Sequence, residues 1–588
     1  MTDRAFTYRT HTCGELRLSD IGQTVVLMGW VHRVRDLGGV SFIDLRDRHG
    51  LTQVVVRTGS PVAEVAARVR PEYVVAVAGA VAAREGAAVN DKLPTGHIEV
   101  VADGLDVLNT ARTPPFAIND DSPVSEDTRL RYRYLDLRRP ALQQNLVLRH
   151  RVALAARRYF DAEGFIEIET PILTRSTPEG ARDYLVPSRV HPGEFFALPQ
   201  SPQIFKQILM IAGMDRYVQI VRCFRDEDLR SDRQPEFTQI DVEMSFATEE
   251  LVYGVVEGAV AAMFAEAGHE VARPFPRLSY TDALLRYGSD KPDLRPGMAI
   301  ADLGDRAAGS AFAVFAEAIA GGGAVRGLVV PGGASYSRKD LDGLAEQART
   351  HGAGGLIWVR VTGGTLQSPA LKAAGESTLR AMFDRAGGAD GALLLIAAGA
   401  TTVVERTLGH IRLAVAKREG LLRDDDFRFA WVTGFPLFAW SEDEGRWEAM
   451  HHPFTAPATA DLARLESDPG SVSARAYDLA LNGSEIAGGS IRIHQADVQR
   501  TVFRLLGISD EQAKARFGFF LDALEYGTPP HGGIAFGLDR IIAVLCGAAS
   551  IREVIAFPKT AQAVDLMAGA PSTVDARQLE DLHIRIRE

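Results

Sequence analysis

The sequence predicts a multidomain α+β protein that begins with a small β-barrel. Its 588 residues exceed what one hydrophobic core usually organises, so three or four domains are expected. Residues 24–108 contain five short β-rich runs and no long helical pattern. Residues 141–283 combine an amphipathic helical stripe with strand patterns, and residues 284–425 are richer in Ala and Gly. These differences in hydrophobic pattern and composition indicate a barrel, a larger domain of helices and strands, and a segment that interrupts that domain.

The composition, with 46% hydrophobic and 24% charged residues, is typical of a globular protein with a sizeable core. The polar start and the lack of an apolar run of roughly 18 residues predict a cytoplasmic protein without a membrane segment. Cys13, Cys223 and Cys546 stand far apart, which favours reduced thiols over disulfides or zinc. The net charge of −11 argues against nonspecific coating of nucleic acid. Residues 1–112 balance 13 basic with 13 acidic residues, so they are the better candidate for a nucleic-acid surface.

The β-rich runs at the amino terminus favour a five-stranded oligonucleotide-binding barrel. The expected strands are Val25–Val34, Val40–Asp47, Leu51–Arg57, Tyr73–Arg84 and His97–Leu108. Phe42, Asp44 and Arg46 share one face of the second strand by period-two spacing, and Arg35 and Gln53 could lie beside them. An exposed aromatic ring among such groups suits stacking on a single-stranded base. The alternative is that Phe42 belongs to the core and the arginines to its rim.

A strand, a charged loop and a returning strand are predicted between residues 217 and 243. The loop mixes both signs of charge: Arg222, Arg225, Arg230 and Arg233 with Asp226, Glu227, Asp228 and Asp232. Such a loop could hold a polyphosphate in arginine forks, or could be a solvated hairpin tip with surface ion pairs. The returning strand places Phe237, Gln239, Asp241 and Glu243 on one face, where a core would need apolar residues. That polar face favours the floor of a ligand site.

Further charged groups stand in apolar surroundings toward the carboxyl terminus. Asp478 and Glu485 could converge on a strand pair, and their hard oxygens suit Mg²⁺ bridging nucleotide phosphates; plain surface acids are the alternative. Arg492 lies between Ile491 and Ile493, so an inward guanidinium there needs an anion. Arg540 follows a glycine-rich strand at the start of an apolar helix, where it could meet a distal phosphate.

Several of these stretches resemble the motifs of class II aminoacyl-tRNA synthetases in their aspartate-subgroup form. FRDED and QPEFTQID resemble the second class motif, GFIEIETPIL the first and HGGIAFGLDR the third. Between them stand TPEG, QSPQ, MHHPFT and SIRIH, which also resemble that subgroup. The motifs occur in the class order and cover essentially the entire chain. The amino-terminal barrel and the Ala- and Gly-rich segment are similar to the anticodon-binding and insertion domains of bacterial aspartyl-tRNA synthetases.

The resemblance implies an ATP-dependent ligase that converts L-aspartate and ATP to aspartyl-adenylate and pyrophosphate, then transfers aspartate to the 3′ end of a tRNA. It also implies a homodimer and an antiparallel catalytic sheet flanked by helices. The expected domains are an anticodon-binding barrel (1–112), a hinge (113–140), a first catalytic part (141–283), an α+β insertion domain (284–425), a second catalytic part (426–560) and a carboxyl-terminal extension (561–588).

The resemblance also assigns roles to individual residues. Arg225 and Arg540 are expected to be catalytic, by neutralising the α- and γ-phosphates of ATP, and Phe237 to stack on adenine. The expected Mg²⁺ ligands are Asp478 and Glu485. The expected aspartate-binding residues are Glu179, Gln203 and Asp241 near the amine, Lys206, His451 and Arg492 at the side-chain carboxylate, with Arg225 and His452. The expected ATP-binding residues are Arg225, Asp226, Glu227, Gln234, Phe237, Glu485, Gly537, Leu538, Asp539 and Arg540.

The same resemblance predicts that Arg35, Phe42 and Gln53 contact the anticodon. Two further positions bear on whether only tRNA(Asp) or also tRNA(Asn) is a substrate. Leu37 resembles the discriminating form of the family, whereas Gly86 resembles the relaxed form. The two positions therefore point to opposite answers.

Two other kinds of protein fit parts of the pattern. An asparaginyl- or lysyl-type relative would share the fold, but the paired cations Lys206 and Arg492 favour an acidic amino acid. A non-catalytic tRNA-binding paralogue would keep the barrel and lose the phosphate-binding arginines. Arg225 and Arg540 are both present, which argues against it.

Overall fold

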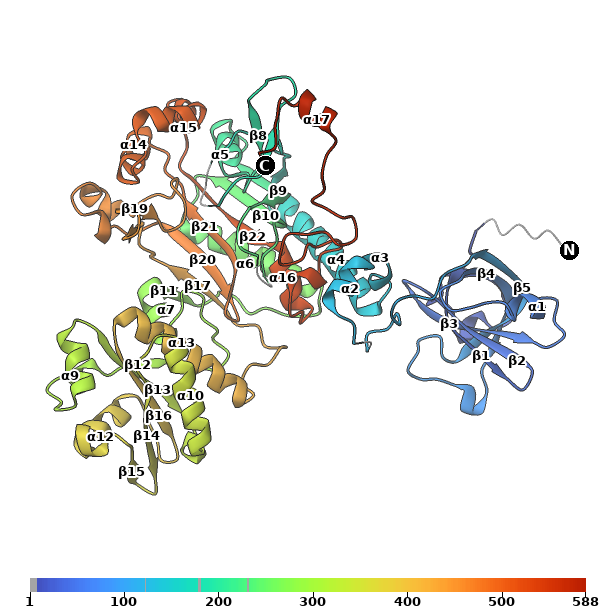
Figure 1. Ribbon diagram of the computed structural model, residues 1–588, viewed down its shortest axis with the longest axis horizontal. Helices are drawn as coiled ribbons and strands as arrows, with labels where there is room; N and C mark the ends of the chain where they lie inside the picture. Colours follow the sequence, from blue (N-terminus) through green and yellow to red (C-terminus); the bar gives the residue numbers. More distant parts are fainter. Residues whose placement is uncertain (1–7, 122, 178–180, 230–231, 588) are drawn as a thin grey trace. The chain divides into compact units, whose positions relative to one another are not determined.

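The computed structural model describes residues 8–121, 123–177, 181–229 and 232–587 (Figure 1). The chain divides into two compact units, which are described separately. One unit runs up to Val147 and includes 556–560 and 564–571; the other holds most of 148–588. Within the described part of the chain, no helix is long and apolar enough to cross a membrane.

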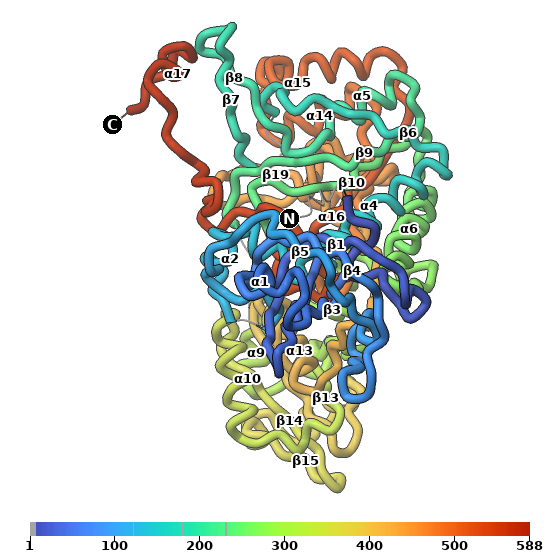
Figure 2. The backbone as a smooth tube through the Cα atoms, turned by 90° about the vertical axis from the view of Figure 1, so that its right-hand side faces the viewer, coloured from blue at the N-terminus to red at the C-terminus, as the bar shows by residue number. Residues whose placement is uncertain are grey.

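The first unit contains a closed five-stranded barrel, drawn in blue in Figure 2. Its strands are β1 (Thr24–Leu37), β2 (Val40–Asp47), β3 (Gly50–Arg57), β4 (Val74–Ala83) and β5 (Ile98–Asn109), with η1 (Leu18–Asp20), α1 (Ala63–Ala66) and η2 (Gly86–Ala88) between or before them. They close in the order β1-β2-β3-β5-β4, and only β3 and β5 run parallel. Alternate residues such as Val25 and Leu27 fill the interior. All five predicted strands are confirmed.

The stretch that follows the barrel is more ordered than a linker. It forms α2 (Glu126–Arg131) and α3 (Arg133–Asp136), then leads into α4 (Pro140–Ala162). The buried Asp136 carboxylate lies 3.0 Å from Arg129 Nε and 2.6 Å from Arg133 Nη1. Arg138 stacks 5.0 Å from the Trp30 ring of β1. Buried ion pairs therefore give this short segment a defined conformation.

The second unit is built on an eight-stranded sheet. Its order is β11 (Arg277–Ser279), β17 (Phe429–Thr433), β20 (Ala476–Leu481), β21 (Ser484–Ile491), β22 (His531–Gly537), β10 (Glu236–Ser245), β9 (Arg216–Phe224) and β6 (Ile166–Glu167). The pairs from β17 to β9 are antiparallel, as predicted, while the short edge strands β11 and β6 pair parallel to their neighbours. The two-stranded sheets are β7 (Leu185–Pro187) with β8 (Phe195–Ala197), and β18 (Phe438–Ser441) with β19 (Arg446–Ala449).

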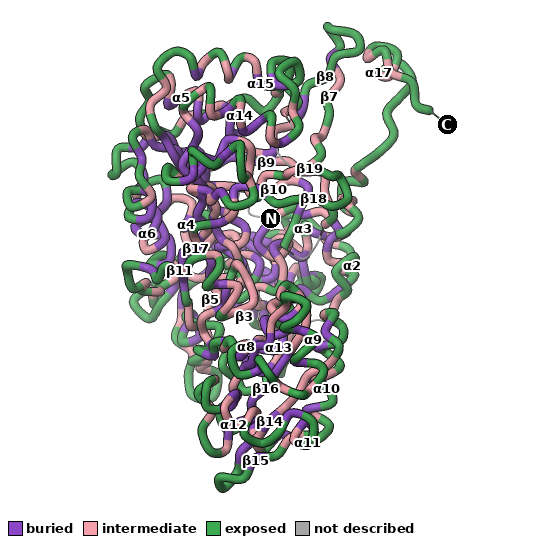
Figure 3. The backbone as a smooth tube through the Cα atoms, turned by 90° about the vertical axis from the view of Figure 1, so that its left-hand side faces the viewer, coloured by how far each residue is buried: buried purple, intermediate pink, exposed green. Residues whose placement is uncertain are grey.

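Helices cover the sheet and leave part of one face open. They are α5 (Gln203–Ile211), α6 (Glu249–Ala265), α7 (Tyr280–Tyr287), α14 (Ala496–Leu505), α15 (Asp510–Leu524) and α16 (Leu538–Leu545), with α17 (Ala576–Asp581) near the end and short turns η4 (Thr459–Arg464), η5 (Pro469–Ser471) and η6 (Ile551–Glu553). One core joins α4, α6 and α16 to the sheet strands, including Phe160, Val256 and Trp431. Figure 3 shows buried stretches in purple near the labels α4, α6 and β17. The uncovered polar face of β10 and its neighbours positions the site.

The interrupting segment folds as an α+β domain, as predicted. Its antiparallel sheet has the order β12 (Ile300–Asp302), β13 (Ala324–Val330), β16 (Leu393–Gly399), β14 (Ile357–Thr362) and β15 (Thr365–Gln367). Its helices are α8 (Gly304–Ala307), α9 (Ala313–Ala320), α10 (Arg338–Thr350), α11 (Leu371–Ala374), α12 (Glu376–Arg385) and α13 (Thr401–Arg418), with η3 (Gly333–Ser335). Separate cores with α10 and α13, and with α9 and α12, show that the sheet is covered on both faces.

Candidate active site and barrel groove

A pocket of about 510 Å³ opens over the polar face of β10, β21 and β22. It brings together most of the predicted site residues: Gln203, Lys206, Arg225, Glu227, Gln234, Phe237, Asp241, His451, His452, Asp478, Glu485, Arg492, Gly537, Asp539 and Arg540. Asp226 and Leu538 do not line it: the Asp226 carboxylate lies 3.5 Å from Arg182, and Leu538 is buried in the core. Glu179 lies outside the described residues.

The pocket floor is a row of buried opposite charges. Asp241 and Glu243 point to the same side of β10, and Lys206 reaches between them from α5. Lys206 Nζ lies 2.6 Å from Asp241 Oδ1 and 3.4 Å from Glu243 Oε2. Arg492 faces Glu243 with both Nε and Nη2, at 2.9 Å and 3.1 Å. Because each buried charge has an opposite neighbour, this floor can stay ionised inside the protein.

Glu243 supplies an anion to Arg492, whereas the resemblance places the side-chain carboxylate of the substrate there. Burial alone would raise the pKa of Glu243, but the charges of Arg492 and Lys206 outweigh it and lower that pKa. For Asp241 burial prevails over Lys206 and raises the pKa. Arg492 is therefore charge-balanced without ligand. Its Nη1 atom donates to Ser490 at 2.7 Å and lies 2.6 Å from His452 Nε2, so described residues occupy this side of the guanidinium as well.

The two adjacent histidines lie in different surroundings. His452 Nε2 is 2.6 Å from Arg492 Nη1, and burial together with the Arg492 charge holds the pKa of His452 well below its ordinary value. His451 packs its ring edge against Phe435 and lies 3.4 Å from Asp478. The neutral His452 therefore neighbours the floor arginine, while His451 neighbours the carboxylate pair described below. The expected contact of His451 with the side-chain carboxylate of the substrate, which Arg492 is also expected to bind, remains a prediction.

Several buried polar atoms around the pocket lack a hydrogen-bond partner among the described residues. They are Gln203 Nε2, Arg225 Nε, Asp241 Oδ2 and His451 Nδ1. Buried polar groups are nearly always satisfied in folded proteins, so a cluster of exceptions indicates a site completed by a ligand. The set offers an acceptor at Asp241 and donors at Gln203 and Arg225, which match an amine and anionic oxygens respectively.

The charged loop before β10 contains a surface ion pair and also a cation at the pocket wall, so it has features of both a solvated hairpin tip and a phosphate-binding loop. Glu227 and Arg233 form a 2.9 Å ion pair of the ordinary surface kind. Arg225 instead lies over the Phe237 ring, with its guanidinium 5.0 Å from the ring centroid. Its backbone N–H donates to the Pro235 carbonyl at 2.9 Å, which fixes the loop against the start of β10. A cation and an aromatic face are thereby held side by side at the pocket wall.

Asp478 and Glu485 converge across the β20–β21 hairpin. A Cβ atom at Gly488, the cross-strand partner of Asp478, would lie 2.7 Å from Asp478 Oδ1 and 3.3 Å from Glu485 Oε1. Only glycine leaves room for both carboxylates there. Burial and the charge of Asp478 raise the pKa of Glu485. Two neighbouring carboxylates suit Mg²⁺. Within the described ranges no third Asp, Glu, His or Cys joins them to form a metal-binding cluster. A bound Mg²⁺ would therefore take its remaining ligands from water and phosphate oxygens.

The start of α16 is fixed beside this pair. Asp539 accepts the Thr238 backbone N–H at 2.8 Å and pairs with Arg149 at 2.5 Å, so its carboxylate joins α16 to β10. Arg540 donates to the Glu485 carbonyl at 2.8 Å and lies 3.4 Å from Asp232. Asp539 thus acts on the site mainly by positioning, whereas Arg540 brings positive charge to the carboxylate end of the pocket.

Mg²⁺ is expected to raise the melting temperature more near pH 8 than near pH 5. Because the pKa of Glu485 is raised in the folded chain, its protonated form adds stability below the ordinary glutamate pKa. That stability is lost as the pH rises through the raised value, and Mg²⁺ restores it by favouring the ionised pair. Thermal scans with and without Mg²⁺ measure the effect. An equal Mg²⁺ increment in Glu485→Gln would contradict it.

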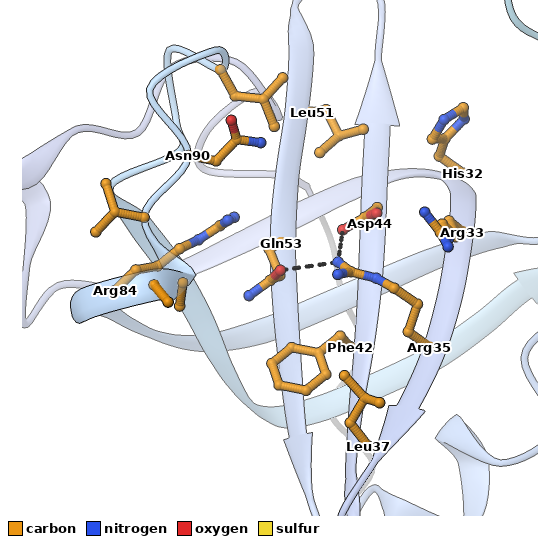
Figure 4. Close-up of a pocket in the computed structure, with 14 residues that line it drawn as sticks. His32, Arg33, Arg35, Leu37, Phe42, Asp44, Leu51, Gln53, Arg84 and Asn90 are labelled. Atoms are coloured by element: carbon orange, nitrogen blue, oxygen red, sulfur yellow. Dashed lines mark hydrogen bonds and ion pairs between the residues drawn. The ribbon is translucent and has the colours of Figure 1, made fainter.

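The barrel carries a second site, a groove of about 750 Å³. Figure 4 shows the Arg35 guanidinium between Asp44 and Gln53, at 2.9 Å and 3.1 Å, with the Phe42 ring beside it. These side chains meet because β2 pairs Phe42 with Arg35 and Asp44 with Gln53 in register. Phe42 is half-exposed and lines the groove, so it does not belong to the barrel core. The aromatic ring of Phe42 and the polar side chains of Arg35 and Gln53 therefore lie together on one open face of the barrel.

Three other barrel residues complete the description of the predicted positions. Leu37, 62% exposed, lines the same groove. Gly86 does not line it but precedes the residues Ala87–Asn90 that do, and its φ of +53° favours glycine. Arg46 points elsewhere, since its guanidinium is buried against Glu72 at 2.8 Å.

Comparisons with known proteins identify the class. The family described as "tRNA synthetases class II (D, K and N)" matches residues 125–561, and the "OB-fold nucleic acid binding domain" matches residues 25–108. The chain therefore belongs to the class II tRNA synthetases. Among curated relatives, the Aspartate--tRNA(Asp/Asn) ligase of Moorella thermoacetica is 56% identical over 98% of this chain and 97% of its own length. The Aspartate--tRNA ligase of Ruminiclostridium cellulolyticum is 52% identical over 98% of each chain. Within the class, the chain belongs to the aspartate–tRNA ligase family.

Solved structures agree at the level of the fold. The asparaginyl-tRNA synthetase from Pyrococcus horikoshii complexed with asparaginyl-adenylate gives a TM-score of 0.58 at 20% identity, covering 94% of this chain and 98% of that one. The aspartyl tRNA synthetase from Entamoeba histolytica gives 0.57 at 18% identity, covering 93% and 90%. The predicted resemblance and fold class are confirmed.

Glu243, Ser490 and Asp290 are three of the lining or floor residues that are not among the predicted site residues. Glu243 shares the polar face of β10 with Asp241, and that alternation is a usable signal. Ser490 accepts from Arg492 Nη1 at 2.7 Å and stands two residues before it, on the same side of the chain. Asp290 lines the pocket from the inserted segment, where neither composition nor a motif marks it.

Proposed function

We propose that this chain activates L-aspartate with ATP and attaches it to the 3′ end of tRNA. The observation that carries the proposal is the set of unsatisfied atoms around one charge-balanced floor, since Asp241 Oδ2, Gln203 Nε2 and Arg225 Nε need an amine and anionic oxygens as partners. An amino acid beside a nucleotide phosphate supplies both. The names of the curated relatives, "Aspartate--tRNA(Asp/Asn) ligase" among them, support the same reaction.

The floor favours aspartate over its amide. Asp241 would accept from the substrate amine, and Arg492 with Lys206 would face the side-chain carboxylate. Asparagine would bring a neutral amide whose N–H₂ group offers no charge to these cations, and a site built for a charged partner rejects such an analogue strongly. Glu179, which stands outside the described residues, keeps its predicted place near the amine.

The nucleotide would occupy the other end of the pocket. Phe237 would stack on adenine, with Glu227 and Gln234 at the rim, Arg225 at the α-phosphate and Arg540 at the γ-phosphate. Mg²⁺ held by Asp478 and Glu485 would neutralise phosphate charge. An oxygen of the aspartate α-carboxylate attacks the α-phosphorus, and the bond to the pyrophosphate oxygen breaks with its electron pair leaving on pyrophosphate. Positioning and charge neutralisation suffice for this step, without a strong general base.

The barrel groove would receive the anticodon. Phe42 would stack on a base while Arg35 and Gln53 read its edge. We propose that both tRNA(Asp) and tRNA(Asn) are charged, because Gly86 has the relaxed form and relatives at 52–56% identity carry the Asp/Asn name. Leu37 argues the other way, which makes the question experimental.

Aspartate attachment to purified tRNA(Asp) and tRNA(Asn) transcripts, with ATP and Mg²⁺, is expected for both. Phe42→Ala should lower kcat/KM for either tRNA by about 10- to 100-fold through the lost stacking, while aspartate-dependent ATP–pyrophosphate exchange stays unchanged. Charging of tRNA(Asp) alone would limit the proposal to that tRNA and give Leu37 the deciding role. Charging of neither would overturn it.

We also propose a homodimer built on the first motif. Ile166 on the edge strand β6 and the nearby Ile172 and Leu173 are 52%, 39% and 52% exposed, which is unusual for apolar side chains so close together. A second copy would cover this edge. Sedimentation should then give twice the chain mass, and a monomer at micromolar concentration would contradict the dimer.

A further inference from the structure

Glu72 lies buried in the turn before β4, in a backbone conformation that residues other than glycine rarely adopt. It is 6% exposed, and its φ is +68°. Its backbone N–H donates to the Val31 carbonyl at 2.7 Å, which attaches the turn to β1. Such a conformation persists only where surrounding contacts hold it, and it often accompanies a functional role. The contacts of the Glu72 carboxylate indicate what that role is.

The carboxylate of Glu72 joins the barrel to the segment that follows it. Arg46 Nη2 of β2 lies 2.8 Å from both carboxylate oxygens. Arg138, two residues after the end of α3, donates from its Nη1 atom to Glu72 Oε2 at 2.8 Å. All three residues belong to the first compact unit. We call Arg46, Glu72 and Arg138 the Glu72 cluster.

A cavity of about 260 Å³ lies where the segment meets the barrel. Trp30 and Arg46 line it from the barrel, and Tyr134 and Leu137 line it from the segment. Trp30 is the β1 residue opposite Arg46, and its ring lies 5.0 Å from the guanidinium of Arg138. Because a cavity separates apolar side chains that could otherwise pack together, Arg138 carries much of the attachment through its ion pair and its stacking contact.

The Glu72 cluster also contacts the wall of the barrel groove. Arg46 Nη1 lies 3.3 Å from His32 Nδ1, and His32 lines the groove together with Arg35 and Phe42. An arginine can only donate, so His32 Nδ1 accepts and its imidazole is neutral. Burial and the charge of Arg46 lower the pKa of His32, which agrees with that state. The groove and the following segment are therefore attached to the same buried carboxylate.

We propose that Glu72 and Arg138 are positioning residues for tRNA charging, because they fix the barrel on the segment of residues 126–139. The inference rests on the proposed function, in which one tRNA binds through its anticodon in the groove and through its 3′ end at the catalytic pocket. When one molecule occupies two sites, the effective concentration of its second end depends on the stiffness of the connection between the sites. A barrel released from the segment would bind the anticodon equally well and would deliver the 3′ end less often.

The test compares the charging of whole tRNA(Asp) with the binding of an RNA hairpin that copies its anticodon stem and loop, using the full chain. Arg138→Met should lower kcat/KM for aspartate attachment by about tenfold, because the effective concentration of the 3′ end falls. The Kd for the hairpin and the rate of aspartate-dependent ATP–pyrophosphate exchange should be unchanged. Arg131→Met, which removes an exposed arginine of α2, is the matched control and should charge tRNA as the wild type does.

A double-mutant cycle shows whether Arg138 acts through Glu72 or by contacting tRNA phosphates. If it acts through Glu72, Arg138→Met should add little to the loss of charging that Glu72→Gln already causes. Additive losses would overturn the proposal. Equal losses in Arg138→Met and Arg131→Met would also overturn it, since that pattern reports lost positive charge rather than a lost attachment.

The remaining outcomes separate this inference from the proposed function. Charging by Arg138→Met at the wild-type rate would overturn the role of the Glu72 cluster alone. A loss of hairpin binding in Arg138→Met as large as its loss of charging would also overturn that role, since it reports damage to the groove itself. If the wild type neither bound the hairpin nor charged tRNA, the proposed function and this inference would be overturned together.

Discussion

Arg225→Gln is expected to lower kcat/KM for aspartate-dependent ATP–pyrophosphate exchange by about 10³-fold or more. The buried Nε of Arg225 has no partner in the described part of the chain, and the guanidinium is held over Phe237 at the pocket wall. A cation fixed in advance stabilises charge on the α-phosphate without reorganisation during the reaction. Removing it takes away that stabilisation and leaves the fold intact, because no ion pair among the described residues is broken.

Arg222→Gln is the matched control for this prediction. Arg222 lies three residues earlier on β9, is 43% exposed, and faces Glu236 at 3.7 Å on the surface. A surface pair of this kind contributes little, so exchange should fall by less than about twofold. Equal losses in the two variants would show that net charge, and not the position of Arg225, governs the rate.

Arg492→Leu is expected to raise KM for aspartate by about 10²-fold or more while KM for ATP changes little. The guanidinium pairs with Glu243 on the pocket floor, whereas Arg225 lies over the Phe237 ring and Arg540 donates to the Glu485 carbonyl. The same change should also lower the melting temperature, because Glu243 would keep only its 3.4 Å contact with Lys206. Breaking a buried ion pair typically costs about 3–5 kcal/mol. Steady-state exchange kinetics and thermal unfolding measure the two effects.

A second variant separates binding from folding. In Arg492→Leu combined with Glu243→Leu, no buried charge is left half-paired, so the melting temperature should recover most of its loss. Aspartate activation should stay as poor as in the single variant, because the cation is still missing. Recovery of both stability and activity would show that Arg492 only maintains the floor, and parallel loss of aspartate and ATP binding would remove its role in amino-acid selection.

The parts of this molecule that the sequence predicts are those set by local pattern. The barrel strands follow from alternation and turn residues, and the polar face of β10 follows from carboxylates at every second position where a core needs apolar groups. The pairing of Glu243 with Arg492 does not follow, because the partners stand 249 residues apart and meet only through the sheet. His451 and His452 are adjacent in sequence, yet they point to different partners.

Composition does not predict a folded segment when buried ion pairs, and not apolar side chains, stabilise it. Residues 113–140 read as a hinge or plain linker, but Asp136 gathers Arg129 and Arg133 and folds part of the stretch into α2 and α3. Asp290 gives no local signal at all, because it reaches the pocket through a loop that packs Asp293 against the turn at Gly483. Such roles depend on which distant strand a loop meets.

The contact between the two ends of the inserted domain has an evolutionary consequence. Arg295 Nη1 lies 2.9 Å from the carbonyl oxygen of Arg423, so the chain leaves and rejoins the catalytic fold at nearly one point. A domain joined in this way can be acquired, exchanged or shortened without redirecting any strand of the larger sheet. Asp290 stands on the near side of that junction. Lineages could therefore remodel everything beyond Arg295 while preserving the short peptide that lines the pocket.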